Sequence, residues 1–206
     1  STDPGFPRDA AAWCNSTGNQ LISKEAAGGK SVVVIEKGEP KSCNIVTSCE
    51  GKGKTFIMFS DDLDKALATF VLANGAAATG QKVTIFFTFW GLNVIKKLHK
   101  PNVEKDIFGK MFGMMLPSSS RKLKLSKMSM GGIGGKMMRY IMNRKGIDSL
   151  ESLRQQALEN GVEFIACQMS MDVMGVKQEE LLDEVTIGGV ATYMERADNA
   201  NINLFI

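Results

Sequence analysis

The thiol of Cys167 is the side chain in this sequence that is best placed to do chemistry. It follows the apolar run 162–166 (VEFIA), which has the composition of a central strand, and precedes residues 168–175, which we expect to open a helix. The amides and dipole of a helix N-terminus stabilise a thiolate, the nucleophilic form of cysteine. Such a thiolate can attack a sulfane sulfur and hold it as a persulfide. A buried structural cysteine is the competing interpretation, and position in the sequence does not separate the two.

Side chains that follow two other apolar runs could surround this thiol. Asp62 follows one run, and Trp90 and Asn93 lie at the end of the next. If the runs are parallel strands, their carboxyl ends meet at the edge where open α/β sheets bind ligands. Capping of a helix by the aspartate and simple packing of the tryptophan are the alternative interpretations. We predict a pocket around the thiol, lined by Asp62, Trp90, Asn93, Gln168, Met169 and Ser170.

The sequence gives no sign of a metal site, an organic cofactor or hydrolase chemistry, and we expect none of them. Besides Cys167 there are three cysteines, none in a CxxC pair or at zinc-type spacing: Cys14, Cys43 and Cys49. A catalytic triad would need His99, the only histidine, which lies in a lysine-rich stretch. The glycines at 131–135 (GGIGG) fit neither a phosphate-binding loop nor a dinucleotide fingerprint. A thiol–disulfide enzyme that pairs Cys167 with Cys43 or Cys49 is one rival hypothesis.

The composition is typical of a globular protein in a reducing compartment. The chain has 206 residues, of which 44% are hydrophobic and 23% charged. Its cysteines do not form a disulfide framework and no signal-peptide pattern is present, so we expect a cytoplasmic location. The longest apolar run, 83–95, is interrupted by polar residues and is too short to span a membrane.

Positive charge is concentrated in residues 96–145. This segment holds thirteen Lys and Arg residues against two acidic ones, although the net charge of the chain is only +3. It also holds eight of the 13 methionines. Such a segment could bind an acidic partner, a charged small molecule or a membrane surface, while a solvated surface is the commoner case. Aromatic residues are scarce in it, so we do not expect a nucleic-acid partner.

Strand and helix patterns alternate over residues 54–206 and predict one α/β domain. This alternation indicates a three-layer α/β/α arrangement around a mainly parallel sheet. Helices are expected between the strands, including at 90–98 and 177–184, and a long loop insertion is expected at 99–135. The five expected strands lie within 55–60, 81–89, 161–167, 185–187 and 201–206.

Residues 1–38 are predicted to form a partial α+β unit, and residues 39–53 have the composition of a linker. The unit would contain one short helix within 9–18 and two strands, 21–26 and 31–37, joined by a Gly-Gly turn. These elements are too few to bury an independent core.

From residue 54 onward the chain resembles the DsrE/DsrF-like sulfurtransferase family, in the branch often fused to CoA-disulfide reductase, rhodanese or TusA modules. The likeness is carried by FSDDLDKALATFVLANGAAATGQKVTIFFTFWGLN, KMSMGGIGGKMM and GVEFIACQMSMDVMGVKQEELLDEVTIGGVATYM. The resemblance implies a five-stranded α/β/α sandwich, a role in sulfur relay and assembly into trimers or hexamers. It also implies that the persulfide-carrying cysteine is Cys167.

Residues 2–37 resemble the second half of a TusA/SirA domain, through their DPG, the WC of the next helix and the closing hairpin. The Cys-Pro-x-Pro motif that carries sulfur in that family is absent. The chain is therefore expected to be part of a longer fusion protein or a degenerate fusion, and the TusA-like half is not expected to transfer sulfur by itself.

Together these features predict a sulfur-relay protein. Cys167 would accept sulfane sulfur from a TusA-like or rhodanese-like persulfide protein, or from a low-molecular-weight persulfide, and pass it to a second thiol. A homo-oligomer is expected. The main rival is a non-catalytic module that docks on sulfur-transfer partners, or peripherally on a membrane, through residues 96–145. The sulfur-relay hypothesis requires that the Cys167 thiol be reachable at the mouth of the fold.

Overall fold

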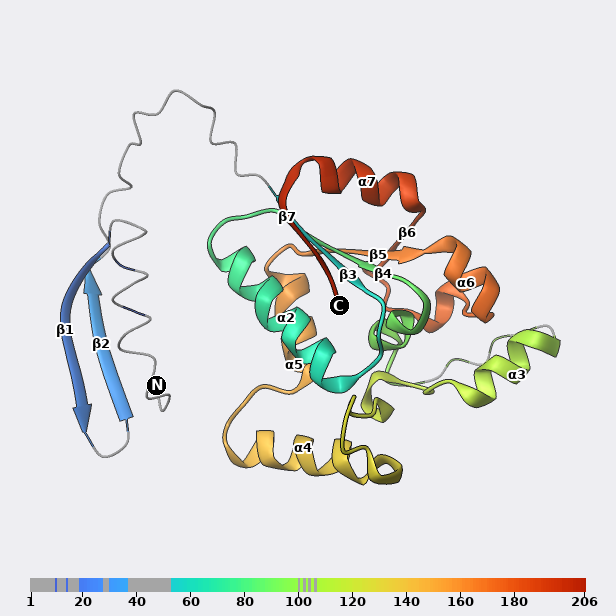
Figure 1. The fold of residues 1–206 in the computed structure, drawn as a ribbon, viewed down its shortest axis with the longest axis horizontal. Coiled ribbons are helices and arrows are strands. Elements are labelled where there is room, and N and C mark those ends of the chain that lie inside the picture. Colours follow the sequence, from blue (N-terminus) through green and yellow to red (C-terminus); the bar gives the residue numbers. More distant parts are fainter. Residues whose placement is uncertain are drawn as a thin grey trace. The chain divides into compact units, whose positions relative to one another are not determined.

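A computed structural model of the chain divides into two compact units, Ser1–Ser48 and Cys49–Ile206. Figure 1 shows the elements of each unit along the chain. The residues that the structure describes are 10, 14, 19–27, 30–36, 53–99, 101, 103, 105 and 107–206.

The first unit contains an antiparallel hairpin of β1 (Gln20–Ala27) and β2 (Lys30–Glu36). Both strands lie where the sequence predicts them. Ala10 and Cys14 are helical and buried, but the rest of the predicted helix and the Gly-Gly turn lie outside the described residues. The predicted linker at 39–53 also lies outside the described residues, except for residue 53. Cys43 and Cys49 belong to this linker and therefore lie outside the described residues too.

The second unit is built on a five-stranded sheet in which every neighbouring pair of strands is parallel. The strand order is β6–β5–β4–β3–β7. Each strand overlaps one of the predicted runs, with ends that differ by one or two residues in most cases, and the predicted α/β fold class is confirmed. The strands are β3 (Gly53–Met58), β4 (Val83–Phe87), β5 (Glu163–Cys167), β6 (Thr186–Gly188) and β7 (Ala200–Phe205).

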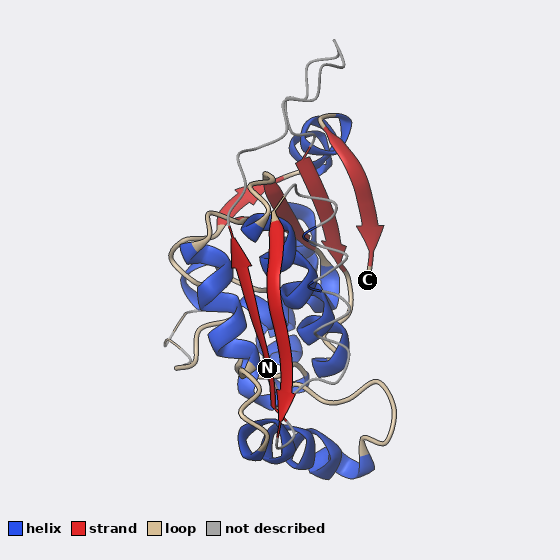
Figure 2. Ribbon diagram, turned by 90° about the vertical axis from the view of Figure 1, so that its left-hand side faces the viewer, coloured by secondary structure: helices blue, strands red, loops and turns tan. Residues whose placement is uncertain are grey.

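Helices cover the two faces of this sheet unequally (Figure 2). On one face α2 (Leu63–Ala78) and α5 (Leu150–Glu159) pack against the strands and against each other, and their side chains belong to the larger buried cluster. Among the described elements, α7 (Val190–Asp198) covers the other face, and Tyr193 is the only buried residue of this helix. The second face is therefore thinly covered.

Two predicted helices differ in the structure. The run at 90–98 forms a 3-10 helix, η1 (Phe89–Ile95), and the run at 177–184 forms only the short η4 (Gln178–Glu180). In η1 the amide of Gly91 donates to the carbonyl of Phe59, which follows β3, at 2.8 Å. Tertiary hydrogen bonding to another strand end thus replaces the regular pattern of an α-helix.

The predicted loop insertion at 99–135 also differs, because it contains a helix. This helix is α3 (Ile107–Met115), and it is followed by η2 (Ser120–Lys122), η3 (Met130–Gly132) and then α4 (Ile133–Arg144). Gly109 of α3 lies against Gly175, and a Cβ on Gly175 would lie 2.5 Å from the Cα of Gly109. Close backbone packing therefore supports a helix that its two glycines made improbable from local preference alone.

Candidate functional site

Three adjacent strands of the sheet end side by side at one edge. β3 ends at Met58, β4 at Phe87 and β5 at Cys167, and these strands are neighbours in the order β5–β4–β3. Because the strands are parallel, the segments that follow them share this edge, as predicted. These segments are the turn before α2, η1, and α6 (Gln168–Met174).

Cys167 is the last residue of β5 and the N-cap residue of α6. It stands opposite Gly188 of β6 in the sheet. The residue is only 2% exposed and belongs to the smaller buried cluster, with Phe86, Ile165 and Tyr193, beneath α7. The strand–helix junction is as predicted, but the thiol is buried rather than open to solvent.

The helix α7 contributes Tyr193 to the buried cluster that holds Cys167, and two of its side chains anchor it to the sheet. The ring of Tyr193 lies 5.2 Å from the ring of Phe86, centroid to centroid, and its hydroxyl lies 3.2 Å from Oγ1 of Thr55. Arg196 donates from Nε and Nη2 to the two carboxylate oxygens of Glu163, at 2.9 and 3.2 Å. These hydrogen bonds hold the pKa of Glu163 below its ordinary value. Both anchors reach from α7 to the strands beneath it.

Ser170, predicted as a pocket residue, is fully buried and ties α6 to the end of β4. Its hydroxyl lies 2.8 Å from the hydroxyl of Thr88, which is also buried. A hydrogen bond between two buried hydroxyls fixes the distance between the elements that carry them. Ser170 therefore positions the first turn of the helix that begins after Cys167.

Asn93 is fully buried and bonds the segment that follows β3. Its Nδ2 donates to Oδ2 of Asp61 at 3.0 Å, whereas its Oδ1 has no hydrogen-bond partner. Burial raises the pKa of Asp61, and the hydrogen bond from Asn93 opposes this rise. It is Asp61, and not the predicted Asp62, that meets Asn93. The two aspartates are adjacent, so the sequence does not indicate which of them turns toward η1.

Asp62 is engaged elsewhere. It occupies the N-cap position of α2 but makes no side-chain capping hydrogen bond. Its carboxylate accepts from the hydroxyl of Ser60 at 2.7 Å and pairs with Lys65 at 2.8 Å. Asp62 thus lies at the expected edge of the sheet, but its partners are residues close to it in the sequence.

Three further predicted residues lie on the surface of this edge. Trp90 of η1 is 42% exposed, and Met169 of α6 is also exposed. Gln168 is exposed and donates to the carboxylate of Asp172 at 3.0 Å, within the same helix. These side chains lie outside the buried cluster that holds Cys167.

The backbone of η1 is pressed tightly against the end of β3. Phe89 has a φ of 46°, a left-handed conformation that costs energy for a residue with a Cβ. A Cβ on Gly91 would clash with the carbonyl oxygen of Met58, so only glycine fits there. Non-glycine residues with positive φ occur preferentially at functional sites, and this one lies at the edge that carries Cys167.

A pocket in the second unit lies away from this edge. It has a volume of about 350 Å³ and is bordered by the start of α2, by α4 and by α5, without any predicted site residue. Within the described parts of the chain, no three His, Cys, Asp or Glu residues are grouped as metal ligands would be. Cys43 and Cys49 lie outside those parts, so the pairing of Cys167 with either of them stays a prediction.

Comparison with known proteins gives a consistent set of relatives. Residues 51–205 match the DsrE/DsrF/DrsH-like family. The uncharacterized protein YrkE of Bacillus subtilis (strain 168) is 44% identical over 155 residues, which cover 75% of this chain and 97% of YrkE. The sulfur carrier protein DsrE2 of Allochromatium vinosum is 38% identical over 161 residues, which cover 76% of this chain and 99% of DsrE2. The crystal structure of the ychN protein from E. coli aligns with a TM-score of 0.45 and 11% identity, over 75% of this chain and 99% of that one.

Proposed function

Because the chain belongs to the DsrE/DsrF/DrsH-like family, we propose that it is a sulfur-relay protein in which Cys167 carries sulfane sulfur as a persulfide. The likeness to a sulfur carrier protein supports the relay role. The observation that carries the assignment to Cys167 is its position, at the carboxyl end of a central strand and directly before a helix. It is also the only cysteine among the described residues of the second unit.

The chemistry that this residue would perform is an exchange between thiols and persulfides. The Cys167 thiolate attacks the terminal sulfur of a donor persulfide, and a new S–S bond forms as the S–S bond of the donor breaks. The electron pair leaves with the donor thiolate, so the step needs no external oxidant. A second thiolate then removes the terminal sulfur from Cys167 in the same way. The N–H groups of the first turn of α6, which have no acceptor within the helix, would stabilise the anionic sulfur.

Because the thiol is buried, the proposal includes a movement that exposes it. The element that must move is α7, because its Tyr193 belongs to the same buried cluster as Cys167. Two features support this. Tyr193 is the only buried residue of the helix, and β7, which follows it at the sheet edge, is exposed at five of its six residues. Elements with few buried contacts open at low free-energy cost. The exposed Trp90 and Met169 would then border the opening.

We propose four further properties. The donor is a TusA-like or rhodanese-like persulfide protein, or a low-molecular-weight persulfide, and the working form is a homo-oligomer, a trimer or a hexamer. The first unit is a partial TusA-like module, which the sequence of residues 2–37 and the antiparallel β1–β2 hairpin support. We assign the chain to the branch of the family that is often fused to CoA-disulfide reductase or rhodanese modules.

Loading with a small persulfide tests the role of Cys167. The full chain is incubated with glutathione persulfide, freed of excess reagent, and its intact mass is measured before and after reduction. Wild type should gain the mass of one sulfur atom and lose it on reduction, whereas Cys167→Ser should gain none. Cys14→Ser, which removes the other buried cysteine, is the matched control and should behave as wild type. A sulfur atom retained by Cys167→Ser would contradict the assignment.

A further inference from the structure

The helix α4 presents apolar side chains to solvent as well as to the core. Four apolar residues of its outer face are between 38% and 66% exposed, and they follow the spacing i, i+4, i+7, i+8 that places side chains on one side of a helix. They are Ile133, Met137, Tyr140 and Ile141. The buried residues of α4 are Gly134, Gly135 and Met142, which lie on its other side. Met138 packs against the core as Met142 does, so the exposed residues form a second apolar stripe on a side that is normally polar in a helix of a globular domain.

The loop before α4 adds two methionines to the same surface, at a cost in backbone strain. Met128 and Met130 are both 68% exposed, and their φ angles of 57° and 41° are left-handed. The loop is held in place by close packing, because a Cβ on Gly134 would clash with the carbonyl oxygen of Met128. The glycines of the GGIGG sequence therefore allow the backbone of α4 to pack closely against the loop. This packing holds the two methionines at the surface in their strained conformation.

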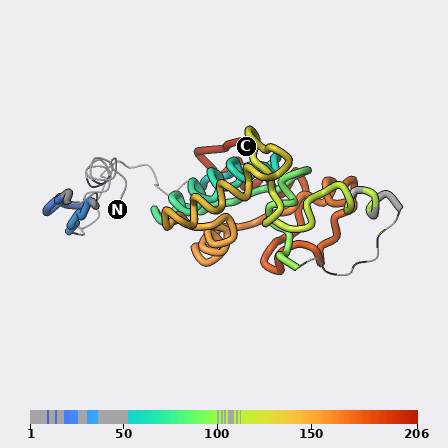
Figure 3. The backbone as a smooth tube through the Cα atoms, turned by 90° about the horizontal axis from the view of Figure 1, so that it is seen from below, coloured from blue at the N-terminus to red at the C-terminus, as the bar shows by residue number. Residues whose placement is uncertain are grey.

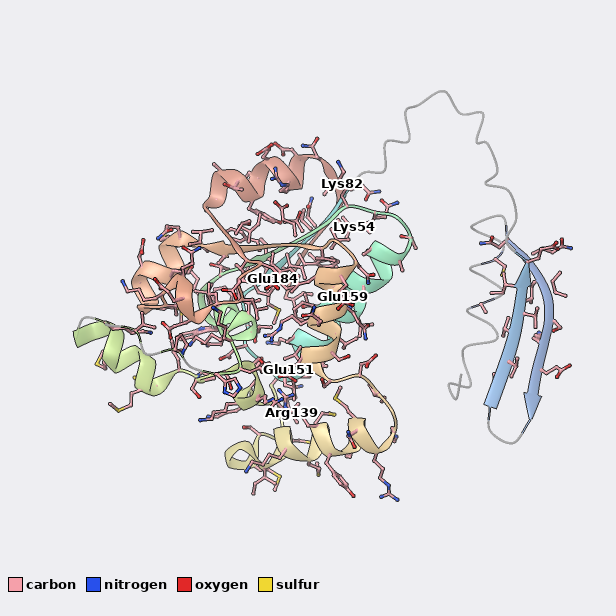
Figure 4. All side chains as sticks on the ribbon, turned by 180° about the vertical axis from the view of Figure 1, so that it is seen from behind. Lys54, Lys82, Arg139, Glu151, Glu159 and Glu184 are labelled. Carbon is pink, nitrogen blue, oxygen red and sulfur yellow. The ribbon has the colours of Figure 1, made fainter. Side chains whose placement is uncertain are left out.

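The segment that carries this apolar surface is strongly basic, although exposed Asp148 follows it and Asp64 accepts hydrogen bonds from Ser126 in the loop before α4. Residues 107–147 contain nine Lys and Arg residues and no Asp or Glu. Lys124, Lys127, Lys136 and Arg144 are all exposed. Arg139 differs from these residues, because its side chain turns inward from α4. Its Nη1 donates to Oε2 of Glu151 at 2.9 Å (Figure 4). The six exposed apolar side chains and the exposed basic ones are called the α4 face below.

We propose that the α4 face binds the surface of an anionic membrane, with α4 lying in the plane of the interface. A helix with Met, Ile and Tyr on one side and Lys and Arg beside them has the composition of an interfacial helix. Each basic side chain adds attraction to an anionic leaflet. No helix in the described part of the chain is both long and apolar enough to cross a bilayer, and α4 itself has only 12 residues.

Charge and shape favour a lipid surface over the other occupants. A second copy of the chain that used this same face would bring two strongly basic faces together, which repel each other. The pocket beside α4 lies on its inner side, where Arg139 and Met142 border it, and not among the outer side chains. Seen from below in Figure 3, α4, in yellow, runs along the outside of its unit. It lies at the opposite end of the unit from α7, so that binding through α4 would leave the cover of Cys167 accessible (Figure 1).

Vesicle co-sedimentation tests this proposal with the full chain. Vesicles of phosphatidylcholine with phosphatidylglycerol are compared with vesicles of phosphatidylcholine alone, at low salt and at about 0.5 M salt, where charges are strongly screened. The triple variant Ile133→Ser, Met137→Ser, Tyr140→Ser removes apolar side chains that are all exposed. The double variant Val190→Ser, Met194→Ser removes exposed apolar side chains from α7 and serves as the matched control.

Wild type should bind the anionic vesicles, about ten-fold or more tightly than the neutral ones, and high salt should weaken the binding. The triple variant should lose about ten-fold or more in binding, while the control and the circular dichroism of both variants stay unchanged. Absence of binding to anionic vesicles overturns the proposal, as does equal loss in the triple variant and the control. A smaller mass of the triple variant in light scattering, without vesicle binding by wild type, would assign the face to contact between copies of the chain.

Discussion

At the scale of single residues, the sheet edge that carries Cys167 depends on two glycines whose neighbours leave no room for a Cβ. Gly188 stands opposite Cys167, and a Cβ on it would lie 2.8 Å from Cγ2 of Ile165. Gly91 fits between η1 and β3 only because it has no Cβ. In both places the neighbour is part of the buried sheet, so it cannot move aside at low cost.

The first prediction concerns Gly91. Gly91→Ala should lower the free energy of unfolding by about 3 kcal/mol, because the new methyl group meets a backbone carbonyl and must displace it. The control is Gly75→Ala in α2, where a Cβ meets nothing within 4 Å. That change should raise the free energy of unfolding by about 0.5–1 kcal/mol, since alanine is the better helix former. Urea denaturation measures both. Equal effects would mean that η1 is not packed as described.

At the scale of secondary-structure elements, the proposed exposure of Cys167 depends on α7. The helix is joined to the strands below it by the Arg196–Glu163 pair and by Tyr193. Few other parts of α7 are buried, so each anchor contributes a large share of what holds it. Weakening either anchor should raise the population in which the thiol is exposed.

Removing the ionic anchor should therefore speed up reaction at Cys167. Arg196→Met keeps the length of the side chain but not its charge, and we expect a several-fold faster reaction with iodoacetamide at neutral pH, read by mass spectrometry. Arg144→Met, on the exposed face of α4, is the control and should react as wild type. An unchanged rate in Arg196→Met would show that the thiol is reached by a route other than movement of α7.

The same pair predicts a dependence of stability on pH. The pKa of Glu163 is lowered in the folded chain, chiefly by hydrogen bonds from Arg196. A carboxyl group whose pKa is lowered on folding stabilises the fold above its unfolded pKa, and this contribution is lost as the pH falls through the folded pKa. The difference in unfolding free energy between wild type and Arg196→Met should therefore be present at neutral pH and vanish in acid. A difference that persists in acid would assign the effect to packing of the arginine.

At the scale of the whole molecule, the chain consists of two units, and the family match lies in the second. The match to the DsrE/DsrF/DrsH-like family covers residues 51–205, and the two relatives align over 97% and 99% of their own lengths. Each relative thus corresponds to little more than the second unit, Cys49–Ile206. A unit with its own core and a sheet of five strands has what independent folding requires.

Removal of residues 1–48 should leave the second unit intact. The melting temperature of the truncated chain should agree with that of the corresponding transition in the full chain within about 2 °C, because the second unit has its own core. Differential scanning calorimetry of the two chains makes the comparison. A large drop in the melting temperature would show that the second unit depends on the first for its stability.

The sequence alone determined where the five strands of the second unit lie along the chain and where the junction at Cys167 falls, because periodicity and strand-end position are local properties. It did not determine that Asp61 rather than Asp62 meets Asn93, or that η1 is a 3-10 helix, because both depend on the neighbouring strand end.

Only the tertiary structure decided the two properties that matter most for function. Cys167 is buried because α7, which begins more than twenty residues later in the chain, returns over the sheet and covers it. The apolar stripe of α4 faces outward because glycines on its other side bring its backbone against the loop before it. The first outcome follows from contact between segments distant in sequence and the second from close packing of backbones, and a local pattern of residues records neither.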